Sequence, residues 1–105
     1  MPGPEAGFRA LVDRVQHGEG TASPELRSQA FDNQGLTQPL ETLIGKVATA
    51  PATVTASDFA AAEAAGYSQD QLFELVVCAA VGQSSRQYEA GLAALAEALG
   101  ADDAP

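Results

Sequence analysis

The chain has 105 residues, enough for one compact domain, and carries a formal net charge of −9 with only 5 lysine and arginine residues. Phosphate backbones and anionic membranes both attract clustered basic side chains, so this charge excludes nucleic acid and a membrane surface as expected partners. The single cysteine cannot form an internal disulfide, and residues 1–16 lack the apolar core of a signal peptide, so we expect a cytoplasmic protein.

Three helices are expected in the first half of the chain. The first has apolar residues at the i, i+3, i+4, i+7 spacing of one helix face, at Phe8, Leu11, Val12 and Val15. Ser23 and Pro24 predict the N-cap and first turn of the second helix, because serine accepts a free backbone N–H and proline needs none there. Thr37 is the expected N-cap of the third helix, and Pro51 stops that helix because proline cannot donate within it.

Two capping boxes predict the helices of the second half. Thr55 pairs with Asp58 and Ser68 pairs with Gln71, and in each pair the two side chains accept free N–H groups at a helix start. Gly66 is the expected left-handed connection between the two helices. Residues 52–54, just before the first box, are expected to be extended.

The helix that starts near Ser68 is the most apolar of the chain and is expected to run to about residue 81. Gly82 leaves open whether this helix kinks, ends or continues. Helical spacing resumes at Tyr88, Leu92, Leu95 and Leu99, and Gly100 is the expected end. Because no segment alternates with period two, we expect one all-α domain over residues 1–105, ordered over about 6–100, built as a small bundle of about five to six helices.

Residues 54–75, with the sequence VTASDFAAAEAAGYSQDQLFEL, resemble part of a known family. They are similar to the T-x-x-D … A-G-hydrophobic-S-x-x-x-hydrophobic-x-E pattern of the carboxymuconolactone decarboxylase and alkylhydroperoxidase D-like superfamily. The resemblance implies that family's helix pair in the C-terminal half, and a homo-oligomer built by packing such pairs between chains. It transfers no functional residue, because the family's Cys-x-x-Cys pair and histidine have no counterpart in this block.

Glu74 and Cys78 are the candidates for a catalytic pair, since residues four apart share a helix face. In one hypothesis they lie in a pocket, where the acid tunes the reactivity of the thiol. In the other, Cys78 is a small buried residue and Glu74 extends to solvent. The second hypothesis is favoured, because a carboxylate raises the pKa of a neighbouring thiol, whereas reactive cysteines need positive surroundings.

His17, the only histidine, is expected to interact with the dipole at the end of the first helix. One histidine and one cysteine do not make a zinc site of the usual kind without several carboxylates. No metal and no cofactor are therefore expected.

The apolar last helix predicts association, because a helix face this apolar needs a partner to cover it. The expected interface residues are Phe73, Val77, Arg86 and Tyr88, which include types enriched at interface hot spots. We expect a homo-oligomer or a larger protein partner. The favoured function is a non-catalytic or accessory, oligomer-forming helical subunit on the scaffold that the resemblance implies. The alternatives are a small enzyme of hydroperoxidase-like or decarboxylase-like type with a site completed between subunits, and a binder of a small apolar ligand.

Overall fold

The computed structural model describes residues 4–103, and within them it contains five α-helices, one short 3-10 turn and no strand. In chain order the elements are α1 (Pro4–His17), α2 (Pro24–Asp32), α3 (Leu40–Thr49), the 3-10 turn η1 (Pro51–Thr53), α4 (Ala56–Ala64) and α5 (Gln69–Asp103). The all-α fold predicted from the apolar spacing is confirmed.

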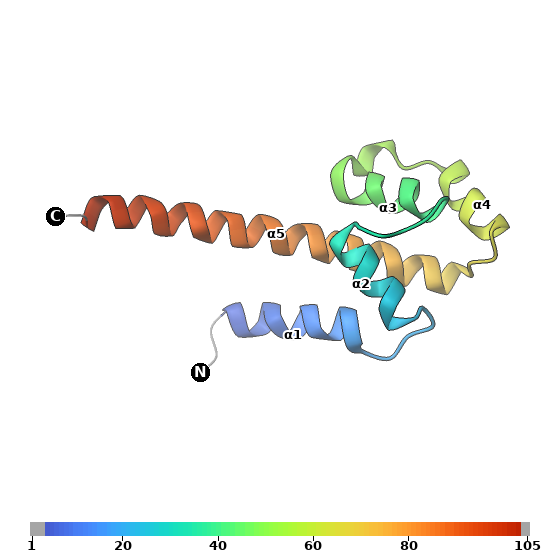
Figure 1. Cartoon of the computed structure of the whole chain (residues 1–105). Coiled ribbons are helices and arrows are strands. Elements are labelled where there is room, and N and C mark those ends of the chain that lie inside the picture. Colours follow the sequence, from blue (N-terminus) through green and yellow to red (C-terminus); the bar gives the residue numbers. More distant parts are fainter. Residues whose placement is uncertain (1–3, 104–105) are drawn as a thin grey trace.

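The other helices are arranged around α5. This helix has 35 residues and a length of about 52 Å, close to the molecule's longest dimension of 60 Å. Figure 1 shows α1 running antiparallel beside α5, α2 crossing it, and α3 and α4 near the end where α5 begins. The C-terminal part of α5 extends away from this body, so the molecule consists of a helical body and a projecting arm.

The hydrophobic core lies between α2, α3 and the first half of α5. Its largest fully buried side chains come from α3 and α5: Leu40, Leu43, Ile44, Leu75 and Cys78. The α3 residues recur at helical spacing and so occupy one face of that helix. Burying a side chain of leucine size contributes about 1.5–3 kcal/mol, so this cluster is what holds α3 against α5.

α5 continues through Gly82 without a break. The glycine does not end the helix; it makes room for α2. A Cβ atom at position 82 would overlap the carbonyl oxygen of Phe31 and lie 2.7 Å from its carbonyl carbon. One turn later, Arg86 Nη1 donates a hydrogen bond of 2.7 Å to the same carbonyl oxygen. Gly82 therefore permits the close crossing of α2 and α5.

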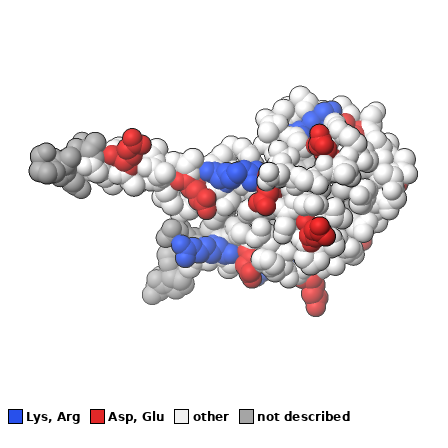
Figure 2. Space-filling model, viewed as in Figure 1, with Lys and Arg blue, Asp and Glu red and all other residues white. Residues whose placement is uncertain are grey.

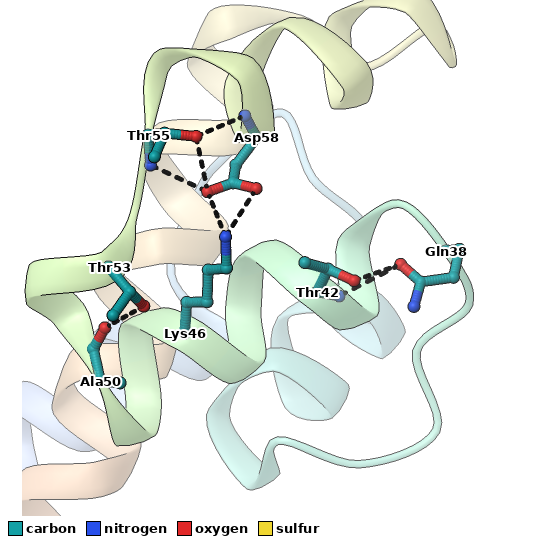
Figure 3. Close-up of polar contacts among 7 residues, drawn as sticks. All are labelled: Gln38, Thr42, Lys46, Ala50, Thr53, Thr55 and Asp58. Carbon is teal, nitrogen blue, oxygen red and sulfur yellow. Dashed lines mark hydrogen bonds and ion pairs between the residues drawn. The ribbon is translucent and has the colours of Figure 1, made fainter.

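The corner between α3 and α4 is held by polar contacts around Asp58 (Figure 3). The predicted capping box is present: the backbone N–H of Thr55 donates to Asp58 Oδ2 at 2.8 Å, and Thr55 Oγ1 accepts from the backbone N–H of Asp58. Lys46 of α3 donates to both carboxylate oxygens of Asp58, at 3.0 and 2.9 Å. The Thr55 backbone N–H, and then the Lys46 ammonium, hold the pKa of Asp58 below its usual value.

The second predicted capping box is also present, at the start of α5. The backbone N–H of Ser68 donates to Gln71 Oε1 at 2.9 Å, and the backbone N–H of Gln71 donates to Ser68 Oγ at 3.1 Å. Gly66, between α4 and α5, has φ = 106°, the left-handed conformation that favours glycine. The sequence signals that position the start of α5 are therefore confirmed.

The structure corrects the expected start of α3. It begins at Leu40 and not directly after Thr37. Gln38 precedes a proline, and the residue before proline is disfavoured in helical conformation, so the helix starts after Pro39. The side chain of Gln38 takes the capping role, accepting from the N–H of Thr42 at 3.3 Å and from its hydroxyl at 2.7 Å (Figure 3).

Two other expected boundaries were wrong. Residues 52–54 are not simply extended, because Pro51–Thr53 form a 3-10 turn in which Thr53 Oγ1 donates to the Ala50 carbonyl oxygen at 2.7 Å (Figure 3). Gly100 does not end α5, which continues to Asp103. A single glycine in an exposed helix costs only about 1 kcal/mol relative to alanine, so it does not by itself terminate the helix.

We predict that Gly82→Ala lowers the free energy of unfolding by about 1–3 kcal/mol, because the new methyl group overpacks the crossing. Helix propensity alone predicts the opposite sign. The matched control is Gly91→Ala, at a helical glycine of α5 where a Cβ atom would meet nothing within 4 Å. Urea denaturation of both variants measures the difference, and equal stabilities would contradict the role of Gly82.

Candidate functional site

Glu74, a predicted candidate residue, binds the loop between α1 and α2. Its carboxylate accepts the backbone N–H of Thr21 at 2.9 and 2.8 Å and that of Ala22 at 3.1 Å, and it also accepts the hydroxyl of Thr21. A Cβ atom at Gly20 would overlap Glu74 Oε1, so a larger residue there would require the Glu74 carboxylate to shift. Glu74 is half-buried, and the loop amides bind both of its carboxylate oxygens, which the sequence did not predict.

Arg27 of α2 lies beside Glu74 and was not recognised from the sequence. The residue is only 5% exposed; its Nη1 donates to the Gly18 carbonyl oxygen at 2.6 Å, and its Nε has no hydrogen-bond partner. A charge this deeply buried needs a counter-charge, which Glu74 provides. The available signal was spacing: Arg27 precedes Ala30 and Phe31 by three and four residues, which puts it on the apolar face of α2.

Opposing effects act on the ionisation of Glu74. Partial burial is the largest of them and opposes ionisation. The hydrogen bonds from Thr21 and Ala22, together with the charge of Arg27, outweigh it and lower the pKa of Glu74 below its ordinary value. Glu74 is therefore an ionised anchor for the loop, not a proton donor poised near neutral pH.

Cys78, the other candidate, is a buried thiol. It is 1% exposed, and its Sγ donates to the Val15 carbonyl oxygen at 3.4 Å. Burial raises the pKa of Cys78 to about 11, Arg27 opposes this rise and Glu74 adds to it. The thiolate is the reactive form of cysteine, so this environment suits packing and not nucleophilic chemistry.

Beside these residues lies an open, mostly apolar pocket of about 320 Å³. Phe73 and Val77 of α5 line it together with Glu74, Arg27 and residues of α1. Phe73 is 70% exposed and also lines a second groove, of about 360 Å³, between α4 and α5. Two of the four predicted interface residues, Phe73 and Val77, therefore lie together on this side of the body.

The other two predicted interface residues, Arg86 and Tyr88, lie further along α5. Phe73 and Tyr88 are 15 positions apart, which is about 22 Å along the helix axis. Arg86 is exposed but donates to Phe31 and, at 3.0 Å, to Gln83 Oε1. The predicted interface residues thus form two separate patches.

A heptad stripe runs along α5, with residues spaced alternately by three and four: Cys78, Val81, Ser85, Tyr88, Leu92, Leu95 and Leu99. α1 covers its first part, because Val15 contacts Cys78 and the Phe8 ring lies 5.2 Å from the Tyr88 ring. We call the last four residues, from Tyr88 to Leu99, the distal stripe. Leu92, Leu95 and Leu99 are 40%, 54% and 54% exposed, and residues 86–100 are exposed throughout.

A notch between α1 and α5 marks the place where this cover ends. It has a volume of about 180 Å³ and is lined mainly by Phe8, Val12, Tyr88 and Leu92, with Arg9 and Glu89 at its edge. The residues of the notch and of the distal stripe were visible in the sequence as a helical repeat. Their exposure was not visible, because it depends on where α1 begins relative to α5.

Other chemistry is limited in the part of the chain that the structure describes. His17 pairs with Asp13 at 3.1 Å, one turn earlier in α1, and is exposed. Among residues 4–103, no group of three or more His, Cys, Asp or Glu side chains is arranged to hold a metal ion. None of the helices in this range combines the length and apolarity that crossing a bilayer requires.

Comparisons of the chain with protein-family models, curated proteins and solved structures find no match. The resemblance to the carboxymuconolactone decarboxylase and alkylhydroperoxidase D-like superfamily therefore stays a prediction.

We predict that Glu74→Gln lowers the free energy of unfolding near neutral pH by about 1–3 kcal/mol, since it weakens charge-assisted hydrogen bonds and leaves Arg27 without its counter-charge. A lowered pKa means that this stabilisation is complete above the ordinary value of 4.5 and is lost as the pH falls through the folded value. The deficit of the variant should therefore shrink in acid. Glu63→Gln, at an exposed position of α4, is the control. A similar loss in both variants by urea denaturation would refute the anchoring role.

We predict that the Cys78 thiol reacts slowly with an aromatic disulfide reagent in the native protein and rapidly once denaturant is added. The reason is its burial and its raised pKa, which leave little accessible thiolate near neutral pH. Since this is the only cysteine, absorbance reports on it alone. Equally rapid labelling in the native state would show a reactive site that the packing does not suggest.

Proposed function

We propose that this protein is a non-catalytic, oligomer-forming helical subunit that associates through the distal stripe of α5. The observation that carries the proposal is the exposure of three leucines at heptad spacing on an arm that the other helices within residues 4–103 leave uncovered. Heptad spacing of apolar residues is the pattern by which helices pair in coiled coils.

The energetics favour covering this stripe. Complete burial of one leucine side chain contributes about 1.5–3 kcal/mol, so covering a half-exposed one contributes about 1 kcal/mol. The stripe is flanked by small residues, including Ala96 and Ala98, which allow a second helix to approach closely. A helical partner therefore suits the stripe better than water does.

The surroundings of Glu74 and Cys78 support a non-catalytic role. The carboxylate is bound by Thr21 and Ala22, and the thiol is buried against Val15. Cys78 lacks the exposure and the lowered pKa that a nucleophile needs, and the lowered pKa of Glu74 does not suit a general base near neutral pH. Both residues instead connect α5 to the α1–α2 region.

The resemblance adds a scaffold to this proposal and no site. The segment that carries it is α4, the Gly66 connection and the first turns of α5, the region whose caps the structure contains. We propose that the chain keeps this helix pair as a platform for association.

The test is the mass of the full chain in solution, measured by size-exclusion chromatography with light scattering over a range of concentrations. The wild type should be a dimer or larger, and Leu95→Glu should shift it to monomer, because a charge would be buried in the seam. Ala90→Glu, an equal charge on the opposite, exposed face of α5, should leave the mass unchanged. A wild type that is monomeric at every concentration would overturn the proposal.

A further inference from the structure

We infer that the distal stripe is covered by the α5 helix of a second copy of this chain, running antiparallel, with Leu99 of the partner subunit seated in the notch beside Tyr88. This inference rests on the proposed function and adds the identity of the partner and the direction in which it binds.

The arrangement of the stripe requires a helix as occupant. Its residues alternate in steps of three and four from Cys78 to Leu99, which keeps one straight seam facing a neighbouring helix. α1 is such a neighbour for the first part of the seam, and it lies antiparallel to α5 (Figure 1). α1 reaches Tyr88 through Phe8, so a second antiparallel helix uses the same mode of packing over Leu92, Leu95 and Leu99 and meets α1 at the notch.

The register follows from the heptad positions. In an antiparallel pair the layers combine the two alternating positions of the heptad, so Leu92 of one copy meets Leu95 of the partner subunit. In that register Tyr88 meets Leu99 of the partner subunit, and both ends of the distal stripe are covered at once. The two contacts are equivalent by two-fold symmetry, so the pair closes as a dimer.

The notch provides a seat for the end of the partner's arm. Phe8 and Val12 of α1, with Tyr88 and Leu92 of α5, surround a space of about 180 Å³. An apolar cavity of about 150 Å³ accepts a molecule of benzene, so the notch has room for an aliphatic side chain. An antiparallel partner adds these α1 residues to the interface and places the end of its arm, not its own α1, beside them.

The charges also favour the antiparallel direction. After Arg86 the sequence has no lysine or arginine, and Glu97, Asp102 and Asp103 make its end acidic. Arg86 on α5 and Arg9 at the edge of the notch lie where the arm leaves the body, and Glu89 is the acidic residue beside them. Figure 2 shows basic side chains at this junction. An antiparallel pair brings the acidic end of each arm near Arg86 and Arg9 of the partner subunit. A parallel pair places the two acidic ends side by side.

Disulfide cross-linking of the full-length chain tests this direction. Two variants, Tyr88→Cys and Leu99→Cys, are purified separately, one with a size tag, and oxidised under mild conditions alone and as a mixture. The antiparallel pair predicts several-fold more covalent heterodimer in the mixture than homodimer from Leu99→Cys alone. In that pair two Leu99 positions are offset by 11 residues, about 16 Å, too far for a disulfide. The wild type, whose only thiol is the buried Cys78, is the control for adventitious links.

The possible outcomes separate this inference from the proposed function. Strong homodimer formation by Leu99→Cys, with little heterodimer in the mixture, would establish a parallel pair and overturn the inference while leaving the proposed function intact. If the wild type is oligomeric by light scattering but neither cysteine variant cross-links, alone or in the mixture, the interface lies elsewhere and the inference is overturned too. A wild type that is monomeric by light scattering would overturn both.

Discussion

Where α2 crosses α5, the carbonyl oxygen of Phe31 lies against Gly82 with no room for a side chain between them, and Arg86 donates to the same oxygen. This close approach brings the buried face of α2 onto α5, and α2 has the most extensive contact with α5 of all the helices. The position of α2 in turn determines where the loop from α1 must run. The core residues of α3 pack against α5, in the same hydrophobic cluster as Ala30 of α2.

The charged residues near the crossing help to hold the same arrangement of helices. Glu74 and Arg27 lie on otherwise apolar helix faces, a placement that first suggests a catalytic site. In the structure they satisfy the backbone of residues 18–22: Arg27 binds the Gly18 carbonyl oxygen, and Glu74 binds the amides of Thr21 and Ala22. That loop determines how α1 returns antiparallel along α5 and covers Cys78. The two charges act on each other without a direct contact, and each is held by its own hydrogen bonds to the loop, so together they favour one geometry of that loop.

How much could be predicted from the sequence depends on how far apart the interacting residues are in the chain. The capping boxes were predictable because Thr55 and Asp58, or Ser68 and Gln71, are only three residues apart. The predicted start of α3 was wrong because the side chain of Gln38 takes the capping role, and glutamine is not a residue type that indicates a cap. The role of Glu74 could not be predicted, because its partner Thr21 is 53 residues away. The question about Gly82 had no local answer for the same reason, since the atom that needs its space belongs to Phe31.

The projecting arm has a consequence for how order is distributed along α5. Beyond Leu92 the helix has its own backbone hydrogen bonds, and residues 93–100 are exposed. A helical segment shorter than about 12–15 residues is only marginally stable in water by itself. Its helix–coil equilibrium therefore lies closer to balance than that of the half inside the body, and fraying from the C-terminal end is the least costly opening of the fold. Any molecule that binds the helical form of the arm shifts that equilibrium toward helix. If the binding molecule is a second copy of the chain, the helix content of the arm rises with protein concentration.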